Sequence, residues 1–111
     1  FHQLTKFFVY SYLLFFKLSR KKKLTLLLHH IVKNVFLLND DYSTMDFVID
    51  ILVKVFRKNQ TEAEAIMLEV HNNQKGLCGV YSFEIASTKV AQVKSLAREK
   101  GFPLKAIMEE E

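Results

Sequence analysis

The sequence contains few of the residues that cross-link small proteins or build their turns. Its 111 residues include one cysteine, one proline, three glycines and no tryptophan. The single cysteine, Cys78, excludes an internal disulfide and is compatible with a reducing compartment. The scarcity of glycine and proline favours long helices and strands over many turns. The length predicts one small domain and leaves room for a tail.

Acidic residues are absent from the first 39 positions, which carry seven basic side chains. The remaining 72 positions carry nine basic and twelve acidic side chains. The formal net charge of +4 therefore belongs to the front of the chain, whereas the rest has a net charge of −3. A body with this charge argues against nucleic acid as a partner.

The front of the chain is also apolar over residues 7–18, which read FFVYSYLLFFKL. This run is shorter than the roughly 20 residues that a membrane-spanning helix needs. It has the length of a signal-peptide core, but a basic stretch at 20–23 follows it in place of a small-residue cleavage site. We therefore interpret residues 1–33 as an apolar, basic extension that is either disordered or mis-annotated upstream sequence. The alternative is a segment that attaches the protein to a membrane surface.

The pattern becomes globular over residues 34–111. Residues 35–38 form an apolar run that predicts a buried strand, and 39–41 predict the turn after it. Ser43 and Thr61 open capping-box patterns, which predict the starts of two helices. We expect the order strand, helix, helix, strand, helix, strand, over residues 35–38, 43–59, 61–72, 77–81, 82–100 and 104–108. This order predicts an α+β fold with three helices on one face of a small sheet.

Each predicted helix has an apolar face at i, i+3, i+4 spacing, which we expect to point into the core. Gly79, inside the second predicted strand, indicates that another group packs closely there. The three faces comprise Met45, Val48, Ile49, Leu52, Val53 and Phe56; then Ala63, Ile66, Met67 and Val70; then Ile85, Ala86, Val90, Val93, Leu96 and Ala97.

Candidate catalytic and metal-binding groups are few. Cys78 and His71 could form a nucleophile–base pair, but Cys78 lies in an apolar strand pattern, where a cysteine is usually buried and inert. His29 and His30 are adjacent and have no acidic neighbour, so they make a poor metal site. The sequence has no zinc-protease, CxxC or phosphate-loop motif. We therefore expect a protein that is not an enzyme and that uses no metal or cofactor.

One polar cluster has two interpretations. Asn39 and Asp40 follow the first predicted strand, and His71 lies near the end of the second predicted helix. Spacing alone indicates only turn residues and a histidine that complements a helix dipole. The stretches of sequence around these residues favour a binding site instead.

Several separated stretches resemble the ClpS family of bacterial and plastid adaptors. They are LLNDDYSTMDFVIDIL (37–52), MLEVH (67–71), GLCGVY (76–81), EIASTKV (84–90) and FPL (102–104), and they extend over about two-thirds of the chain. The resemblance implies a three-stranded antiparallel sheet in the order βααβαβ, similar to the C-terminal domain of ribosomal protein L7/L12. It also implies an adaptor of the ClpAP protease that recognises N-degrons, as a monomer in the bacterial cytoplasm.

The resemblance further implies a role for individual residues. The positions that match the family's site for the substrate α-amino group are Asn39, Asp40, His71 and Ser43, the last in place of the usual threonine. Those that match its hydrophobic pocket are Met45, Val48, Met67, Val70 and Leu104. Glu84 and Lys89 match positions that dock on the N-terminal domain of the unfoldase ClpA. The implied substrates are proteins that begin with Leu, Phe, Tyr or Trp.

These residue types suit the implied chemistry. An α-ammonium has three N–H donors and a full charge, and Asn39, Asp40 and His71 offer an amide oxygen, a carboxylate and a neutral ring nitrogen. Methionines make adaptable pocket walls for a large apolar side chain. The alternative is a general protein-interaction domain of the same fold, in which the polar cluster would only form turns and caps.

Overall fold

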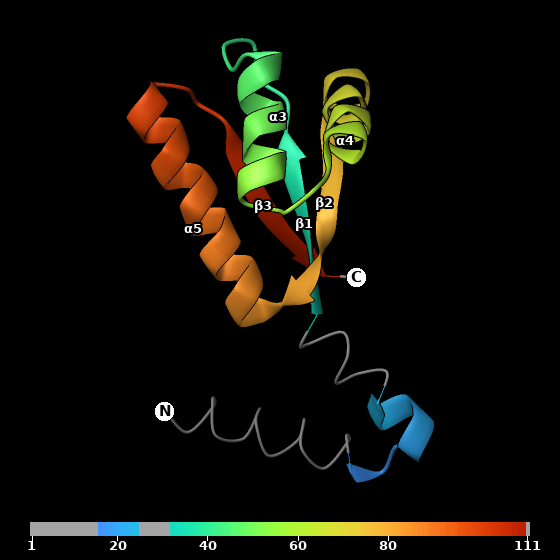
Figure 1. Ribbon diagram of the computed structural model, residues 1–111. Helices are drawn as coiled ribbons and strands as arrows, with labels where there is room; N and C mark the ends of the chain where they lie inside the picture. Colours follow the sequence, from blue (N-terminus) through green and yellow to red (C-terminus); the bar gives the residue numbers. More distant parts are fainter. Residues whose placement is uncertain (1–15, 25–31, 111) are drawn as a thin grey trace. The chain divides into compact units, whose positions relative to one another are not determined.

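The computed structural model describes residues 16–24 and 32–110 (Figure 1). The chain divides into two compact units, Phe1–Ile31 and Val32–Glu111, whereas we expected a boundary between residues 33 and 34. In the first unit, residues 20–24 are helical. Most of the apolar run at 7–18 and both histidines at 29–30 lie outside the described residues, so their interpretation stays a prediction. No helix within the described ranges is long and apolar enough to cross a membrane.

The second unit has the predicted order of strands and helices. β1 and β2 extend further than their apolar runs, because polar residues at their ends also take part in the ladder. β3 begins one residue later than predicted and continues to Glu110. The elements are β1 (Val32–Leu38), α3 (Met45–Lys54), α4 (Gln60–Asn73), β2 (Lys75–Ser82), α5 (Phe83–Lys100) and β3 (Lys105–Glu110).

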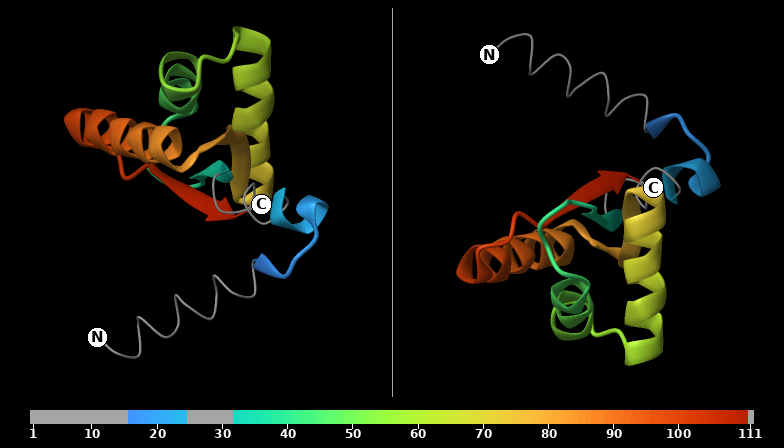
Figure 2. Two further views of the ribbon diagram at one scale, coloured as in Figure 1. Left: turned by 90° about the horizontal axis from the view of Figure 1, so that it is seen from below. Right: turned by 90° about the horizontal axis from the view of Figure 1, so that it is seen from above.

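The sheet has β1 at its centre, in the order β2-β1-β3, and both strand pairs are antiparallel. Side chains alternate along β1, and Val35 and Leu37 are fully buried. Figure 2 shows α3, α4 and α5 on the same side of the sheet. The predicted α+β fold, with three helices on one face of a three-stranded antiparallel sheet, is confirmed.

Two helix starts differ from the predicted capping boxes. Thr44, not Ser43, caps α3, and its hydroxyl accepts a hydrogen bond from the Phe47 N–H at 3.1 Å. Asn59, not Thr61, caps α4: its side-chain oxygen accepts from the Glu62 N–H at 2.8 Å. Asparagine is at least as good an N-cap as threonine, and with Asn59 in that position Thr61 falls inside the first turn.

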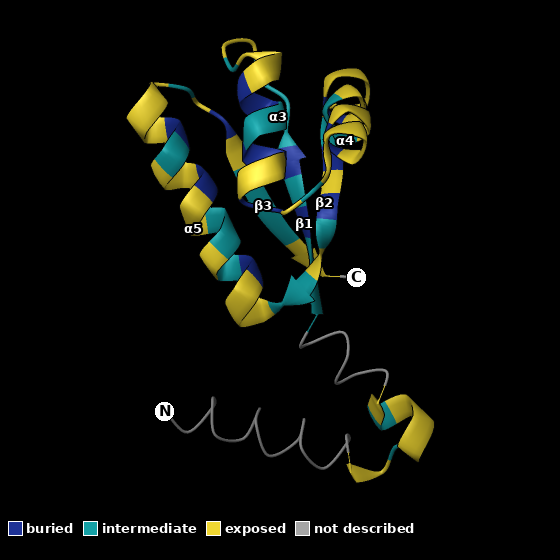
Figure 3. Cartoon of the chain, viewed as in Figure 1, coloured by how far each residue is buried: buried dark blue, intermediate teal, exposed yellow. Residues whose placement is uncertain are grey.

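The buried face of α3 is rotated from the predicted one. Met45 and Val53 remain 49% and 37% exposed, whereas Phe47 and Ile51 are 8% and 0% exposed. The prediction for Ile85 at the start of α5 was also wrong, since this side chain is 51% exposed. Figure 3 shows the buried residues of the helices on the sides that face the sheet and one another. The core consists of Val35, Leu37, Phe47, Val48, Ile51, Leu52, Val55, Phe56, Ala63, Val70, Cys78, Ala86, Val93, Ala97 and Leu104.

Cys78 belongs to this core and is fully buried in β2. Burial, which disfavours the thiolate, raises the pKa of its thiol to about 12. The thiol is therefore uncharged at neutral pH, as expected for an inert core cysteine.

Two glycines of β2 leave room for neighbouring groups. A Cβ atom on Gly79 would lie 2.6 Å from the Tyr81 hydroxyl oxygen, so the predicted close approach is confirmed. A Cβ atom on Gly76 would lie 2.7 Å from Val70 Cγ2 and 3.1 Å from the Ile66 carbonyl oxygen. Gly76 therefore allows α4 to lie directly on β2.

Replacement of Gly76 by alanine should push α4 away from β2. The stiff Val70 side chain and the α4 backbone cannot both yield at no cost, so we expect the free energy of unfolding to fall by about 1–3 kcal/mol. Urea denaturation of Gly76→Ala measures this loss. Gly101→Ala is the control for backbone strain without crowding, because Gly101 has φ +76° and a Cβ atom added to it would meet no atom within 4 Å. Unchanged stability of Gly76→Ala would contradict the close contact.

Candidate functional site

A cavity of about 260 Å³ lies where the end of β1 meets α3 and α4. Polar residues from the turn after β1 line one part, and apolar residues of both helices line the other. The lining residues are Asn39, Asp40, Asp41, Ser43, Met45, Val48, Met67, Val70 and His71. The structure thus brings together all four residues predicted for the α-amino site and four of the five predicted for the hydrophobic pocket.

The end of α4 is joined to the end of β1 by Gln74 and Asn39. The Asn39 N–H donates to the Gln74 carbonyl at 2.8 Å, and the side-chain amide of Asn39 donates to Gln74 Oε1 at 3.5 Å. Gln74 has φ 71°, the left-handed conformation that ends a helix. Because His71 lies in the last turn of α4, this junction brings it to the cavity that Asn39 also lines.

Asp40 is held by the turn that leads into α3. Its Oδ1 accepts hydrogen bonds from the N–H groups of Tyr42 and Ser43, at 2.8 and 2.6 Å. Burial raises the pKa of the Asp40 carboxyl, but the hydrogen bonds from Ser43 and Tyr42 outweigh this effect and bring the pKa below its usual value. The carboxylate therefore keeps its negative charge throughout the neutral range.

Two oxygens at this turn have no partner. Asp40 Oδ2 and Ser43 Oγ are buried and form no hydrogen bond of good geometry with a described residue, although the Ser43 hydroxyl lies near enough to the Asp40 carboxylate to help lower its pKa. Buried polar atoms in native proteins are nearly always paired, and each exception needs an explanation. A cationic donor in the cavity would satisfy both atoms.

The apolar part of the cavity has firm and adaptable walls. Val48 and Val70 are 7% and 3% exposed, so each has one side in the core and the other at the cavity. Met67 is half-buried, and Met45 stands at the rim with 49% of its surface exposed. Methionines can repack around ligands of different shape.

Leu104 and Asp41 lie differently from the sequence-based assignment. Leu104 is 3% exposed and lines a separate groove between α5 and the chain that follows it. Asp41 lines the cavity although we did not single it out. The sequence did place Asp41 in the predicted turn at 39–41. It could not show which side chains of that turn point toward the cavity.

Glu84 and Lys89 lie together in another groove, which α5 forms with the end of α3. Glu84 is exposed in the first turn of α5. Lys89 Nζ donates to the Val55 carbonyl at 2.7 Å and lies 5.0 Å from the centre of the Tyr81 ring. Lys89 thereby satisfies a carbonyl at the end of α3, in addition to any contact with a partner.

The cavity offers acceptors and an apolar wall, but no catalytic or metal-binding set. Among residues 16–24 and 32–110, no group of three His, Cys, Asp or Glu side chains could hold a metal ion. Cys78, the candidate nucleophile, is buried in the core and does not line the cavity. The arrangement can hold a small cationic group beside a large apolar one.

Comparisons with known proteins agree on one family. The model of the ClpS family, described as ATP-dependent Clp protease adaptor protein ClpS, matches residues 32–107. A ClpS adapter protein of Wolinella succinogenes is 59% identical over 76 residues, which cover 68% of this chain and 74% of the relative. That of Oleidesulfovibrio alaskensis is 48% identical over 99 residues, 85% of this chain and 95% of the relative.

A solved structure has the same fold. It is described as Agrobacterium tumefaciens ClpS2 bound to L-phenylalaninamide, with a TM-score of 0.71 and 34% sequence identity. The similarity covers 74% of this chain and 99% of that chain. The expectations of a ClpS-type adaptor and of a protein that is not an enzyme are confirmed. This chain belongs to the ClpS family of ATP-dependent Clp protease adaptor proteins.

Proposed function

We propose that this adaptor binds the free N-terminus of proteins that begin with a large hydrophobic residue and delivers them to the unfoldase ClpA. The observation that carries this proposal is the pair of unpartnered buried oxygens, Asp40 Oδ2 and Ser43 Oγ, beside an apolar wall. An N-terminal residue presents a cation and a side chain on the same carbon atom, so one residue can occupy both parts of the cavity.

The polar end suits an α-ammonium group. Its three N–H donors need several acceptors, of which at least one should be anionic. Asp40 Oδ2 supplies the charge. The side-chain nitrogen of Asn39 donates to Gln74 Oε1, which leaves the side-chain oxygen of Asn39 to accept from the ligand. A neutral ring nitrogen of His71 is the third acceptor. The α-amino pKa near 8 leaves most free N-termini charged at neutral pH.

The apolar end suits the side chains of Leu, Phe, Tyr and Trp. Burial of such a side chain against Val48, Val70 and Met67 contributes roughly 1.5–3 kcal/mol. Each hydrogen bond to a charged group contributes roughly 1.5–3 kcal/mol before ordering costs. Together these terms are compatible with a dissociation constant in the micromolar range, about −8 kcal/mol.

The described relative supports the same ligand chemistry. ClpS2 of Agrobacterium tumefaciens was solved with L-phenylalaninamide, a phenylalanine with a free amino group and an amide in place of the following peptide bond. Such a molecule reproduces the first residue of a polypeptide. We place the equivalent residue of a substrate in the cavity between α3 and α4.

Acetylation of the substrate should abolish binding. We expect a peptide that begins with Phe or Leu to bind, and its N-acetylated form to bind at least about 100-fold more weakly, because it loses the charge and two donors. Fluorescence anisotropy with the two peptides measures the difference. Equal affinity would favour a general protein-interaction domain of the same fold.

Asp40 and the neighbouring Asp41 form a matched pair for mutation. Asp40→Asn keeps the shape of the side chain but removes the charge, and we expect a loss of affinity of about tenfold or more. Asp41→Asn makes the same chemical change on an exposed side chain and should cost less. Because the pKa of Asp40 lies below its usual value, the difference should persist at pH 5 and shrink only in stronger acid. Similar losses for both variants would remove Asp40 from the site.

We further propose that the groove with Glu84 and Lys89 docks on the N-terminal domain of ClpA. Glu84→Lys should reduce ClpA binding while peptide affinity stays unchanged, since this exposed residue does not line the cavity between α3 and α4, which we call the peptide cavity. Lys89→Ala is less informative, because it also removes the bond to Val55. Pull-down of ClpA, with peptide anisotropy in parallel, tests the assignment; full ClpA binding by Glu84→Lys would contradict it.

A further inference from the structure

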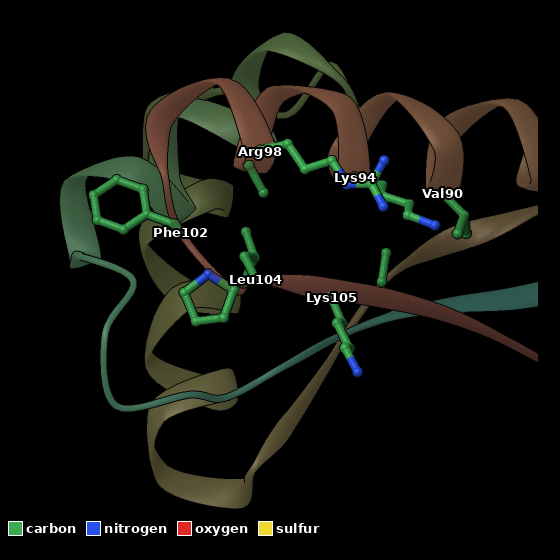
Figure 4. Close-up of a pocket in the computed structure, with 9 residues that line it drawn as sticks. Val90, Lys94, Arg98, Phe102, Leu104 and Lys105 are labelled. Carbon is green, nitrogen blue, oxygen red and sulfur yellow. The ribbon is translucent and has the colours of Figure 1, made fainter.

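A second hollow lies between α5 and the segment that leads into β3. Its volume is about 430 Å³, larger than that of the peptide cavity. Figure 4 shows it between α5, which carries Val90, Lys94 and Arg98, and the chain that carries Leu104 and Lys105. The complete lining is Val90, Lys94, Ala97, Arg98, Phe102, Pro103, Leu104, Lys105 and Ala106. We call this hollow the α5–β3 groove.

The floor of the α5–β3 groove is apolar. Ala97 and Leu104 are 2% and 3% exposed and form part of the core. Phe102, half-buried beside them, packs against Phe47 with ring centroids 4.8 Å apart. This floor is supported from behind, so an apolar side chain could pack on it without rearrangement of the core.

The rim of the groove carries charges of one sign. Lys94, Arg98 and Lys105 are exposed, and none of them forms a salt bridge with a described residue. No aspartate or glutamate is among the described residues that line the groove. Lys94 and Arg98 stand one helical turn apart, where like charges destabilise a helix.

Three other cations of the unit are paired with carboxylates. Lys33, Lys54 and Lys75 each lie within 3.2 Å of a carboxylate oxygen. The residues from position 40 onward have a net charge of −3, so carboxylates are plentiful. Lys94, Arg98 and Lys105 gather around one apolar floor with no acidic residue in the described lining, and this cluster fits an external anionic group.

We propose that the α5–β3 groove binds an acidic peptide segment of a partner protein, anchored by one apolar side chain. The floor takes the apolar side chain, and Lys94, Arg98 and Lys105 take the flanking carboxylates. β3 pairs with β1 alone among the described strands, so an extended peptide could add to the start of β3, where Lys105 and Ala106 line the groove. A long polyanion such as nucleic acid would also meet the acidic remainder of the surface, which a short segment avoids.

This groove is separate from the peptide cavity between α3 and α4. The two share no lining residue. A ligand with a blocked N-terminus can therefore test the groove without the α-amino site. The result does not depend on whether the proposed N-degron function is correct.

The test uses the full chain and an N-acetylated peptide in which glutamates flank a central leucine. Two comparison peptides carry glutamine for glutamate, or serine for leucine. We expect the first peptide to shift amide signals of Val90, Lys94, Arg98 and Lys105 in NMR spectra, and both comparison peptides to bind more weakly. Affinity should fall as salt rises, because exposed charges are screened.

Arg98→Glu and Lys100→Glu are the matched variants. Both residues lie in the last turn of α5 and undergo the same change of charge, but only Arg98 lines the groove. We expect Arg98→Glu to weaken peptide binding about fivefold or more and Lys100→Glu about twofold at most. Thermal unfolding shows whether each variant is folded.

Three outcomes would overturn the proposal. The glutamine peptide could bind as tightly as the glutamate peptide, which would remove the role of charge. Lys100→Glu could weaken binding as much as Arg98→Glu, which would indicate general attraction to a basic surface. Inorganic phosphate could displace the peptide completely at equal concentration, which would indicate a simple anion site.

Discussion

Hydrogen bonds between Asn39 and Gln74 hold the end of α4 against the end of β1. This junction brings together residues that lie far apart in the chain, because Asn39 and Asp40 follow β1 whereas His71 lies in the last turn of α4. Gly76, just after the junction, lets α4 lie directly on β2. The position of the polar acceptors thus depends on main-chain contacts, not on the flexible side chains alone.

The same cavity combines well-paired and unpaired groups. One oxygen of Asp40 is held by two main-chain N–H groups, which keep the carboxylate charged and fix its orientation. The other oxygen and the hydroxyl of Ser43 are buried without a partner. Val48 and Val70 form the core and the cavity wall at once. An acceptor that is oriented in advance loses little entropy when a cation binds.

The α5–β3 groove, like the cavity, combines an apolar surface with charged side chains, but its charges are positive and those of the cavity are negative. Carboxylate and amide oxygens surround the peptide cavity, whereas cations surround the groove. The core connects the two sites, because Phe102 at the groove packs on Phe47, the neighbour of Val48 in α3. The two surfaces share no lining residue, so the two proposed ligands would not compete for the same side chains.

The sequence alone determined the α+β class, the order of the elements and the members of the cavity apart from Asp41, because periodicity, turn residues and family motifs are local signals. It could not determine the buried face of α3, since α3 packs against other helices as well as the sheet, which buries Phe47 and Ile51 and leaves Met45 exposed. Nor could it place Leu104. This residue belongs to the same core as Val48 and Val70 of the cavity, but it lines the α5–β3 groove. The reason is physical. The spacing of residues along the sequence shows which of them lie on the same face of a helix, but only the packing of all three helices on the sheet decides what that face contacts.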